Sequence, residues 1–107
     1  GNRGERTATA VTACLWHSDG ELRLAAAKAL AKVVAKGDKG VITEVTSRLH
    51  DSSKRVRLTA LWALAQVAAK GDAWTIATVM ASLQDSSAAV RRAAVEALAG
   101  LVERGDE

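Results

Sequence analysis

The sequence has no phenylalanine, tyrosine or proline, and its only aromatic side chains are three tryptophans, which make up 3% of the 107 residues. Hydrophobic residues nevertheless account for 49% of the chain. The interior therefore has to be built from alanine, leucine and valine, and such small or aliphatic side chains suit closely packed helices. A chain of this length is enough for one domain with a modest core.

The chain also lacks any uninterrupted apolar run of about 18 residues, the length that a helix needs to cross a membrane, so we expect no membrane insertion. It has a single cysteine and cannot form an internal disulfide, which favours a reducing intracellular compartment, either the cytoplasm or the lumen of an organelle. No secretory signal precedes the first helical pattern, and the first residue is glycine rather than methionine. We therefore expect a processed form or an excised piece of a longer chain.

Positive charge is unevenly distributed along the chain, whose formal net charge is +3. Residues 1–37 and residues 38–71 each carry six basic and three acidic groups, whereas residues 72–107 carry three basic and six acidic groups. One end of the molecule should be basic and the other acidic. Because acidic residues interrupt the basic ones and the last third is net acidic, nucleic acid is an unlikely partner compared with a protein or peptide.

An internal repeat of 34 residues dominates the sequence. The dipeptide Gly-Asp recurs at 37–38, 71–72 and 105–106. Between residues 17–38 and 51–72, twelve of twenty-two positions are identical without a gap, and between 51–72 and 85–106 eleven are identical. Repetition at such a period is typical of solenoid proteins, in which each unit is one supersecondary element. We predict a single domain over 1–107, with units at about 4–37, 38–71 and 72–105.

Each unit contains two helical patterns, which are clearest in the second unit. Asp38 can cap a short helix over about 39–49, and Ser52 or Ser53 can cap a longer helix that ends near Ala69. In the first unit the corresponding longer helix has a possible capping box of Ser18 and Glu21.

Glycine is expected to end the longer helix at Gly71, because it adopts the left-handed conformation without strain. The apolar stripe of the longer helix should make the core, and alanines on it let neighbouring helices approach closely. Six helices in three antiparallel pairs result, and stacking of the pairs makes an all-α protein, an α-solenoid. The stripe in the second unit comprises Val56, Ala60, Ala63, Leu64 and Val67.

The segments DSSKRVRLTALWALAQVAAKGD and DSSAAVRRAAVEALAGLVERGD, with SDGELRLAAAKALAKVVAKGD as a looser copy, resemble HEAT repeats of the short, PBS-lyase-like class. The resemblance covers nearly the whole chain and implies a right-handed HEAT-like solenoid that serves as a binding scaffold. It also implies a structural ladder in which a turn aspartate pairs with a helix arginine of the same unit, with an anion site as the alternative role. The first unit has His17 in place of the aspartate. The ladder consists of Arg23, Arg57, Arg91, Asp51 and Asp85.

Candidate catalytic and metal-binding residues are few. Cys14 and His17 lie three residues apart, but a thiolate–imidazole nucleophile also needs an orienting group and an oxyanion site, and neither is evident. His17, His50 and Asp51 fall in equivalent turns, yet structural zinc sites use four ligands at tighter spacing. We therefore predict no enzyme activity, no cofactor and no metal site.

Trp62 does not belong to the apolar stripe of its helix. The 34-residue register aligns it with Lys28 and Glu96, and such variable positions mark a surface that is free of the common packing constraint. In HEAT-like stacks the second helix of each pair lines the concave side, so Trp62 would either anchor a partner in a groove or simply cover alanine-rich surface. The predicted concave-face residues are Leu24, Lys28, Lys32, Arg55, Leu58, Trp62, Gln66, Arg92 and Glu96.

The function that these features favour is a scaffold that binds a peptide or protein on the concave face of the long-helix layer. The alternative is a structural segment of a longer repeat array, or a small auxiliary subunit of a larger complex. The third unit supports this alternative, because nothing in the sequence after Leu98 and Leu101 covers its apolar edge. Self-association or continuation through the C-terminal repeat edge is therefore expected.

Overall fold

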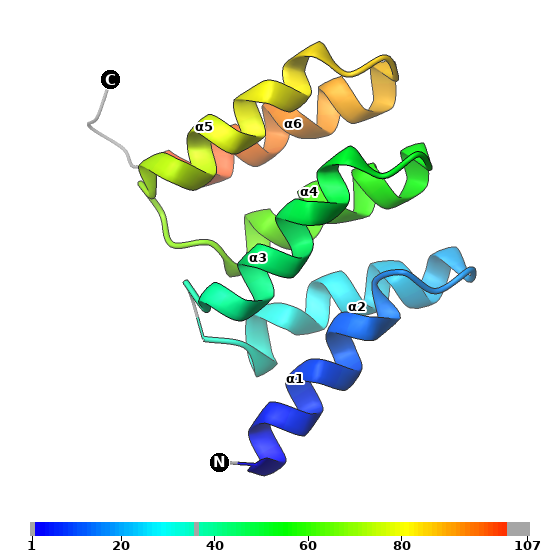
Figure 1. Ribbon diagram of the computed structural model, residues 1–107, viewed down its shortest axis with the longest axis vertical. Helices are drawn as coiled ribbons and strands as arrows, with labels where there is room; N and C mark the ends of the chain where they lie inside the picture. The colour runs from blue at the N-terminus through cyan, green and yellow to red at the C-terminus, as the bar shows by residue number, and fades with distance from the viewer. Residues whose placement is uncertain (1, 36, 103–107) are drawn as a thin grey trace.

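The computed structural model describes residues 2–35 and 37–102, in which every regular element is helical (Figure 1). No helix among these residues has the length and apolar character needed to cross a bilayer. The elements in chain order are α1 (Asn2–Cys14), α2 (Gly20–Val33), α3 (Lys39–Ser47), the 3-10 turn η1 (Arg48–His50), α4 (Lys54–Val67), α5 (Ala73–Ala81), the 3-10 turn η2 (Ser82–Gln84) and α6 (Ala88–Leu101).

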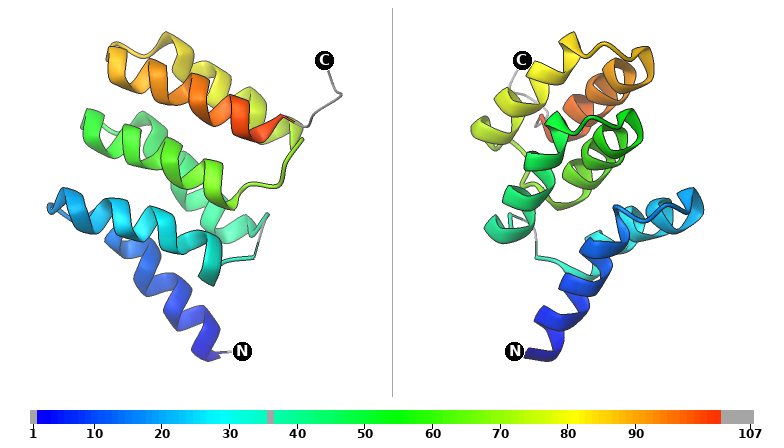
Figure 2. Two further views of the ribbon diagram at one scale, coloured as in Figure 1. Left: turned by 180° about the vertical axis from the view of Figure 1, so that it is seen from behind. Right: turned by 45° about the vertical axis from the view of Figure 1, so that its right-hand side comes forward.

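The helices form antiparallel pairs, α1 with α2, α3 with α4 and α5 with α6, which stack along the long axis of the molecule (Figure 1). The long helices α2, α4 and α6 lie side by side in one layer, and α1, α3 and α5 make the other, as the two views of Figure 2 show. α4 packs against both α2 and α6 and is the centre of the stack. This architecture is the expected α-solenoid.

Aspartates start the two later short helices, as the sequence predicts for the first of them. The carboxylate of Asp38 accepts a hydrogen bond from the amide of Val41 at 3.0 Å, and that of Asp72 accepts one from Thr75 at 3.0 Å. Each carboxylate thus satisfies an amide that has no partner in the first turn of its helix. The last residues of both predicted short helices form 3-10 turns instead of continuing the α-helix.

The long helices begin differently from the expectation. Asp19 caps α2 by accepting from the amide of Glu21, so the predicted capping box of Ser18 with Glu21 is wrong. A carboxylate is a stronger acceptor than a hydroxyl and satisfies the amide instead. At α4, Ser53 holds the capping position but its side chain makes no capping hydrogen bond.

Gly37 and Gly71 lie in the turns that follow the long helices and connect neighbouring pairs. α4 ends at Val67 with an extended capping residue, so Gly71 is not the helix stop that the sequence predicts. Gly37 and Gly71 have φ angles of 82° and 79°, a left-handed conformation that costs other residues strain. The Gly37 amide donates to the carbonyl of Val67 and the Gly71 amide donates to that of Leu101, each at 2.7 Å. The turn that ends one long helix is therefore hydrogen-bonded to the end of the next long helix.

The core follows the predicted stripe but is wider than predicted. Ala60, Ala63, Leu64 and Val67 are buried on α4, whereas Val56 at its start is half-buried. The structure also buries Thr59, Leu61 and Ala68, because α4 is covered by helices on three sides rather than on one. The Thr59 hydroxyl donates to the carbonyl of Arg55 at 2.8 Å, so its burial leaves no unsatisfied polar atom.

Trp16 joins the first pair to the second. Its indole nitrogen donates to a carboxylate oxygen of Glu44 at 3.2 Å. The guanidinium of Arg48 lies over the same ring, 4.7 Å from the ring centre. Such a cation–π contact at a partly exposed site is worth about 0.5–1 kcal/mol. Trp16 therefore packs between repeats rather than facing a partner.

Candidate binding groove on the long-helix layer

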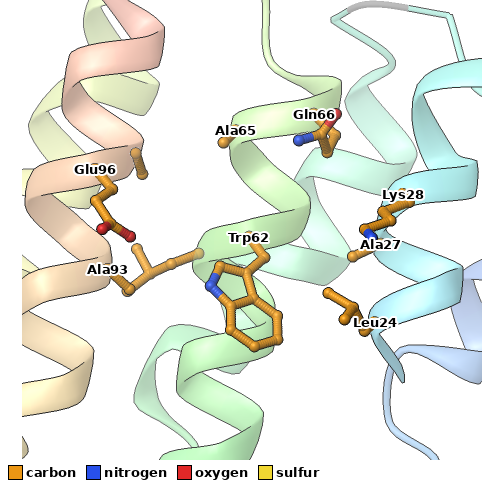
Figure 3. A pocket seen from close by; sticks show the side chains of 10 residues that line it. Leu24, Ala27, Lys28, Trp62, Ala65, Gln66, Ala93 and Glu96 are labelled. Atoms are coloured by element: carbon orange, nitrogen blue, oxygen red, sulfur yellow. The ribbon is translucent and has the colours of Figure 1, made fainter. Parts of the chain in front are cut away.

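An open groove of about 230 Å³ crosses the exposed face of the long-helix layer. Its walls come from all three long helices, so residues far apart in sequence meet there (Figure 3). Most of the lining is apolar, and the charged groups stand on opposite walls. The lining residues are Leu24, Ala27, Lys28, Leu61, Trp62, Ala65, Gln66, Ala93, Glu96 and Ala97.

Trp62 occupies the middle of the groove. It projects from α4, with Leu24 and Lys28 of α2 on one side and Glu96 of α6 on the other (Figure 3). The side chain is half-buried and packs against the core. The tryptophan ring therefore presents apolar surface to solvent while part of it is held in place by the protein.

Small side chains create the hollow around Trp62. Ala27 on α2 and Ala93 and Ala97 on α6 are buried in the groove floor, and Ala65 lies one turn beyond Trp62 on α4. Because alanine has only a β-carbon, the space between the long helices is left open wherever it stands on this face.

Five of the nine predicted concave-face residues meet in this groove: Leu24, Lys28, Trp62, Gln66 and Glu96. The sequence reasoning missed Leu61 and the four alanines of the lining. The signal for Ala27, Ala65 and Ala93 was their spacing of three residues from a predicted position, which places them on the same helix face. Ala97 lies four residues after Ala93 on that face.

The other four predicted residues lie outside the groove. Lys32 is exposed beyond it, and Arg92 is exposed with its Nε 3.7 Å from Oε2 of Glu96. Leu58 is half-buried against the core. Arg55 lines a separate hollow beside the turn of the first repeat, together with His17 and Arg23.

The arginine ladder differs from the predicted pairing of residues within one unit. Nε of Arg57 lies 2.8 Å from Oδ2 of Asp85, and Nη2 lies 3.1 Å from Oδ1, so the carboxylate partner belongs to the next unit. The predicted pairing of the Asp51 and Arg57 side chains is wrong, because Nη1 of Arg57 donates to the backbone carbonyl of Asp51 at 2.7 Å. The hydrogen bond from Arg57 lowers the pKa of the Asp85 carboxyl below its ordinary value, against an opposing effect of burial.

Arg23 and Arg91 repeat the backbone contact of Arg57. Nη1 of Arg23 donates to the carbonyl of His17 and Nη1 of Arg91 donates to that of Asp85, each at 2.7 Å. The predicted side-chain pairing of Asp85 with Arg91 is therefore wrong as well, since Asp85 gives its carboxylate to Arg57. In each unit the arginine closes the turn before its own helix.

The alternative residues for chemistry are not brought together as a set. Cys14 is half-buried, and Nδ1 of His17 accepts a hydrogen bond from the Asp19 amide at 3.0 Å. Asp51 and Asp85 accept the equivalent amides of Ser53 and Ser87, so His17 takes the same turn role as the aspartates. Among residues 2–35 and 37–102, no group of three or more histidine, cysteine or acidic side chains has the arrangement to hold a metal ion.

The fold and the groove together define an α-solenoid built from helix pairs. The sequence profile described as HEAT repeats matches residues 42–107, and the chain belongs to the HEAT-repeat family. HEAT repeats are generally scaffolds for protein interaction and are typically not enzymes. The match begins inside α3, so the first pair, in which His17 replaces the turn aspartate, lies outside it. No curated protein matches the chain.

Proposed function

We propose that the groove binds a peptide segment of a partner protein and that Trp62 is its central anchor. The observation that carries the proposal is the position of a partly exposed tryptophan in an apolar groove between a lysine and a glutamate. Aromatic side chains at the centre of an interface, surrounded by groups that exclude water, commonly dominate its binding free energy. The chain belongs to a family of interaction scaffolds, and binding a peptide requires contacts but no catalytic group.

The charges of the groove define the chemistry of the partner. Lys28 on α2 and Glu96 on α6 stand on opposite sides of Trp62 (Figure 3). A matching segment carries an apolar side chain that packs on Trp62, an acidic residue on the α2 side and a basic residue on the α6 side. The charged pairs would set the direction of the segment and its association rate more than its affinity.

The competing explanation is that Trp62 only covers the alanine-rich floor of the layer. Ala27, Ala93 and Ala97 are buried beneath this face, and a large ring over them removes apolar surface from water without any partner. The two explanations differ in what removal of the ring does. A cover contributes to folding, whereas an anchor contributes mainly to binding.

A peptide-display selection on the full chain tests the proposal. Selected peptides should bind the unchanged protein, and Trp62→Ala should weaken them about thirtyfold, which corresponds to about 2 kcal/mol. Trp74→Ala is the matched control, because Trp74 is an exposed tryptophan on α5, outside the groove lining. Its removal should leave the affinity unchanged. If the peptides bind both variants equally, Trp62 is not the anchor.

A second selection tests the predicted charge pattern. Peptides selected on Lys28→Glu should lose the acidic residue next to the apolar anchor and gain a basic one. Peptides selected on Lys32→Glu should keep the original pattern, because Lys32 lies outside the groove lining. If the peptide consensus on Lys28→Glu is unchanged, the groove does not select its partner by charge.

A second function, a structural segment within a larger assembly, is supported by a different surface. Val95 on α6 and Met80 on α5 are exposed apolar side chains at the far end of the stack. This function does not exclude the first, because the groove faces the side of the stack rather than its end.

A further inference from the structure

The junctions between repeats show which surfaces of a helix pair are made to be covered. Leu61 on α4 and Ala68 directly after it are buried, as are Ala27 on α2 and Val34 directly after it, at the same repeat positions. Both rows lie on or directly after long helices that are followed in the stack by another long helix. We call this side of a pair its trailing face, and the opposite side its leading face.

The trailing face of the third pair is uncovered in the described residues and remains apolar. Val95 is 57% exposed, whereas Leu61 at the same repeat position is 0% exposed. Met80 is 52% exposed, whereas Thr46 at its position is 9% exposed. Apolar side chains thus stand exposed at positions that the second pair buries. Such a patch at the end of a stack is typical of an interaction surface.

The leading face of the first pair is the matching half at the other end. It forms an open apolar hollow of about 200 Å³ between α1 and α2. Leu22 in this hollow is 36% exposed, whereas Val90 at the same repeat position is 1% exposed, because α6 is covered by α4. The lining residues are Val11, Cys14, Leu22, Ala25, Ala26 and Ala29.

The first and the last third of the sequence carry opposite net charge. Residues 1–37 carry six basic and three acidic groups, a net of +3, and residues 72–107 carry three basic and six acidic groups, a net of −3. Within the described residues of the third pair the balance is two basic against three acidic groups, and Asp85 is already paired with Arg57 inside the stack. The opposite net charges of the two segments favour contact between unlike ends over contact between like ends.

We propose that the trailing face of the third pair binds the leading face of a second copy of this chain, so that copies associate head to tail and continue the solenoid. The contact repeats the geometry of the two internal junctions, in which the trailing face of one pair packs on the leading face of the next. Because the two faces differ, the contact is heterologous and does not close on itself as a two-fold dimer does.

One element of the internal junction is incomplete in this contact. Arg57 binds Asp85 of the following pair, so Arg91 at the equivalent position would need an acidic residue in the first turn of the second copy. That position holds His17. The first internal junction also lacks this ion pair, since Arg23 donates to carbonyls of its own turn. Association between copies should therefore be weaker than a junction that contains the ion pair.

Two single-face variants distinguish this arrangement from any other. Val95→Glu places a charge on the trailing face and Leu22→Glu places one on the leading face, and both side chains are exposed enough to be replaced without disturbing the core. In sedimentation velocity the unchanged chain should grow in mass with concentration beyond a dimer. Each variant alone should remain a monomer. Their equimolar mixture should form a dimer and nothing larger, because one intact leading face and one intact trailing face remain.

The control variant for this experiment is Trp62→Ala, which alters the groove and neither end face, and which should associate like the unchanged chain. Failure of the groove proposal would therefore leave this result unaffected. If the unchanged chain stays monomeric at millimolar concentration, or if Leu22→Glu still associates, the head-to-tail arrangement is wrong. The second result would indicate a two-fold contact between trailing faces instead. A mixture that stays monomeric would also overturn the proposal.

His17→Asp offers a gain-of-function test. Asp51 and Asp85 accept the amide two residues ahead just as His17 does, so the substitution should keep the turn intact. The new carboxylate should bind Arg91 of a second copy and lower the dissociation constant about tenfold. Arg91→Ala in the same chain should cancel that gain. An unchanged dissociation constant for His17→Asp would show that the copies do not meet as the second and third pairs do, where Arg57 binds Asp85.

Discussion

Arg57 and Asp85 form a bidentate ion pair between the second and third helix pairs, with Nε 2.8 Å from Oδ2 and Nη2 3.1 Å from Oδ1. The two side chains are only 14% and 11% exposed, so the pair is shielded from water and salt. Arg57 at the same time donates to the carbonyl of Asp51. The side chain of Arg57 thus stabilises both the turn of its own repeat and the contact with the turn of the next repeat.

Arg57→Ala should therefore destabilise the protein more than Arg91→Ala. Both variants lose the hydrogen bond to a carbonyl in their own turn, but only Arg57→Ala leaves the carboxylate of Asp85 without its cation. The difference in unfolding free energy between the two variants should be about 1–3 kcal/mol, the range for hydrogen bonds to charged groups. Urea denaturation of both variants measures it. Equal losses would mean that the ion pair adds nothing beyond the backbone contact.

The stability of the protein should fall in acid partly through Asp85. Its pKa is lowered in the folded state, chiefly by the hydrogen bond from Arg57. The stability that this pair contributes is present above the unfolded-state pKa of about 4 and is lost as the pH falls through the folded-state value. The difference in unfolding free energy between the unchanged protein and Asp85→Asn should be largest near neutral pH and should shrink below about pH 4. A constant difference from neutral pH to pH 3 would contradict this assignment.

Some acid sensitivity should survive in Asp85→Asn. Hydrogen bonds from the side chain and amide of Thr75 lower the pKa of Asp72 in the same direction. Asp72 is exposed at the start of α5 and its hydrogen-bond donors are neutral, so its contribution should depend little on salt.

Leu64→Ala should leave a cavity in the centre of the stack and lower the unfolding free energy by about 2–5 kcal/mol. Leu64 is fully buried on α4. Leu24→Ala is the matched control, because Leu24 is an exposed leucine of the groove on α2, and it should cost less than about 1 kcal/mol. Thermal or urea unfolding compares the two. Similar losses would mean that the faces of the long helices are wrongly assigned.

Leu58→Ala should lower the unfolding free energy more than a substitution at an exposed groove position would. Leu58 is half-buried and packs against the core, so Leu58→Ala should fall between the two other leucine variants.

Trp62→Ala should shift the thermal midpoint by no more than a few degrees. In a protein of about 100 residues, 1 kcal/mol corresponds to about 4–8 °C. A partner anchor that is partly exposed in the free protein should contribute less to folding than a cover or a core residue. Differential scanning calorimetry measures the midpoint without any partner. A decrease of about ten degrees or more would place Trp62 in the core and remove the centre of the proposed groove.

Two glycine substitutions should act in opposite directions. Gly37 has a φ of 82° and an added β-carbon would meet nothing closer than 3.9 Å, so Gly37→Ala should cost about 1–2 kcal/mol through backbone strain alone. Gly100 lies exposed in the last turn of α6, where an added β-carbon meets no neighbour. Gly100→Ala should stabilise the protein by up to about 1 kcal/mol. Chemical denaturation of both variants would reveal the opposite signs, and a loss of stability in both would contradict the explanation.

The helices and their starts could be read from the sequence because they depend on neighbours within one helical turn. Asp38 caps α3 as the local pattern predicts, and Gly71 takes the expected left-handed conformation, although α4 ends earlier, at Val67. The stripe of Ala60, Leu64 and Val67 is buried for the same reason, since a spacing of three or four residues places side chains on one helix face.

The particular acceptor at a helix start was less predictable, because several polar side chains compete within two or three residues. Asp19 rather than Ser18 caps α2. The sequence shows that an acceptor is present, but the backbone conformation decides which side chain reaches the amide.

The contacts between repeats were decided by the tertiary structure. Asp51 and Asp85 have the same sequence relation to the arginines that follow them, yet only Asp85 binds the side chain of Arg57 through its carboxylate. The partner depends on the distance and rotation between one pair and the next, which result from the packing of all the long helices together. The convergence of Lys28, Trp62 and Glu96 in one groove has the same origin: the 34-residue register aligned these positions, and the spacing between helices placed Lys28 and Glu96 on the two sides of the tryptophan. Leu58 and Arg55 were predicted with them but lie outside the groove, because Leu58 packs against the core and Arg55 lines a separate hollow.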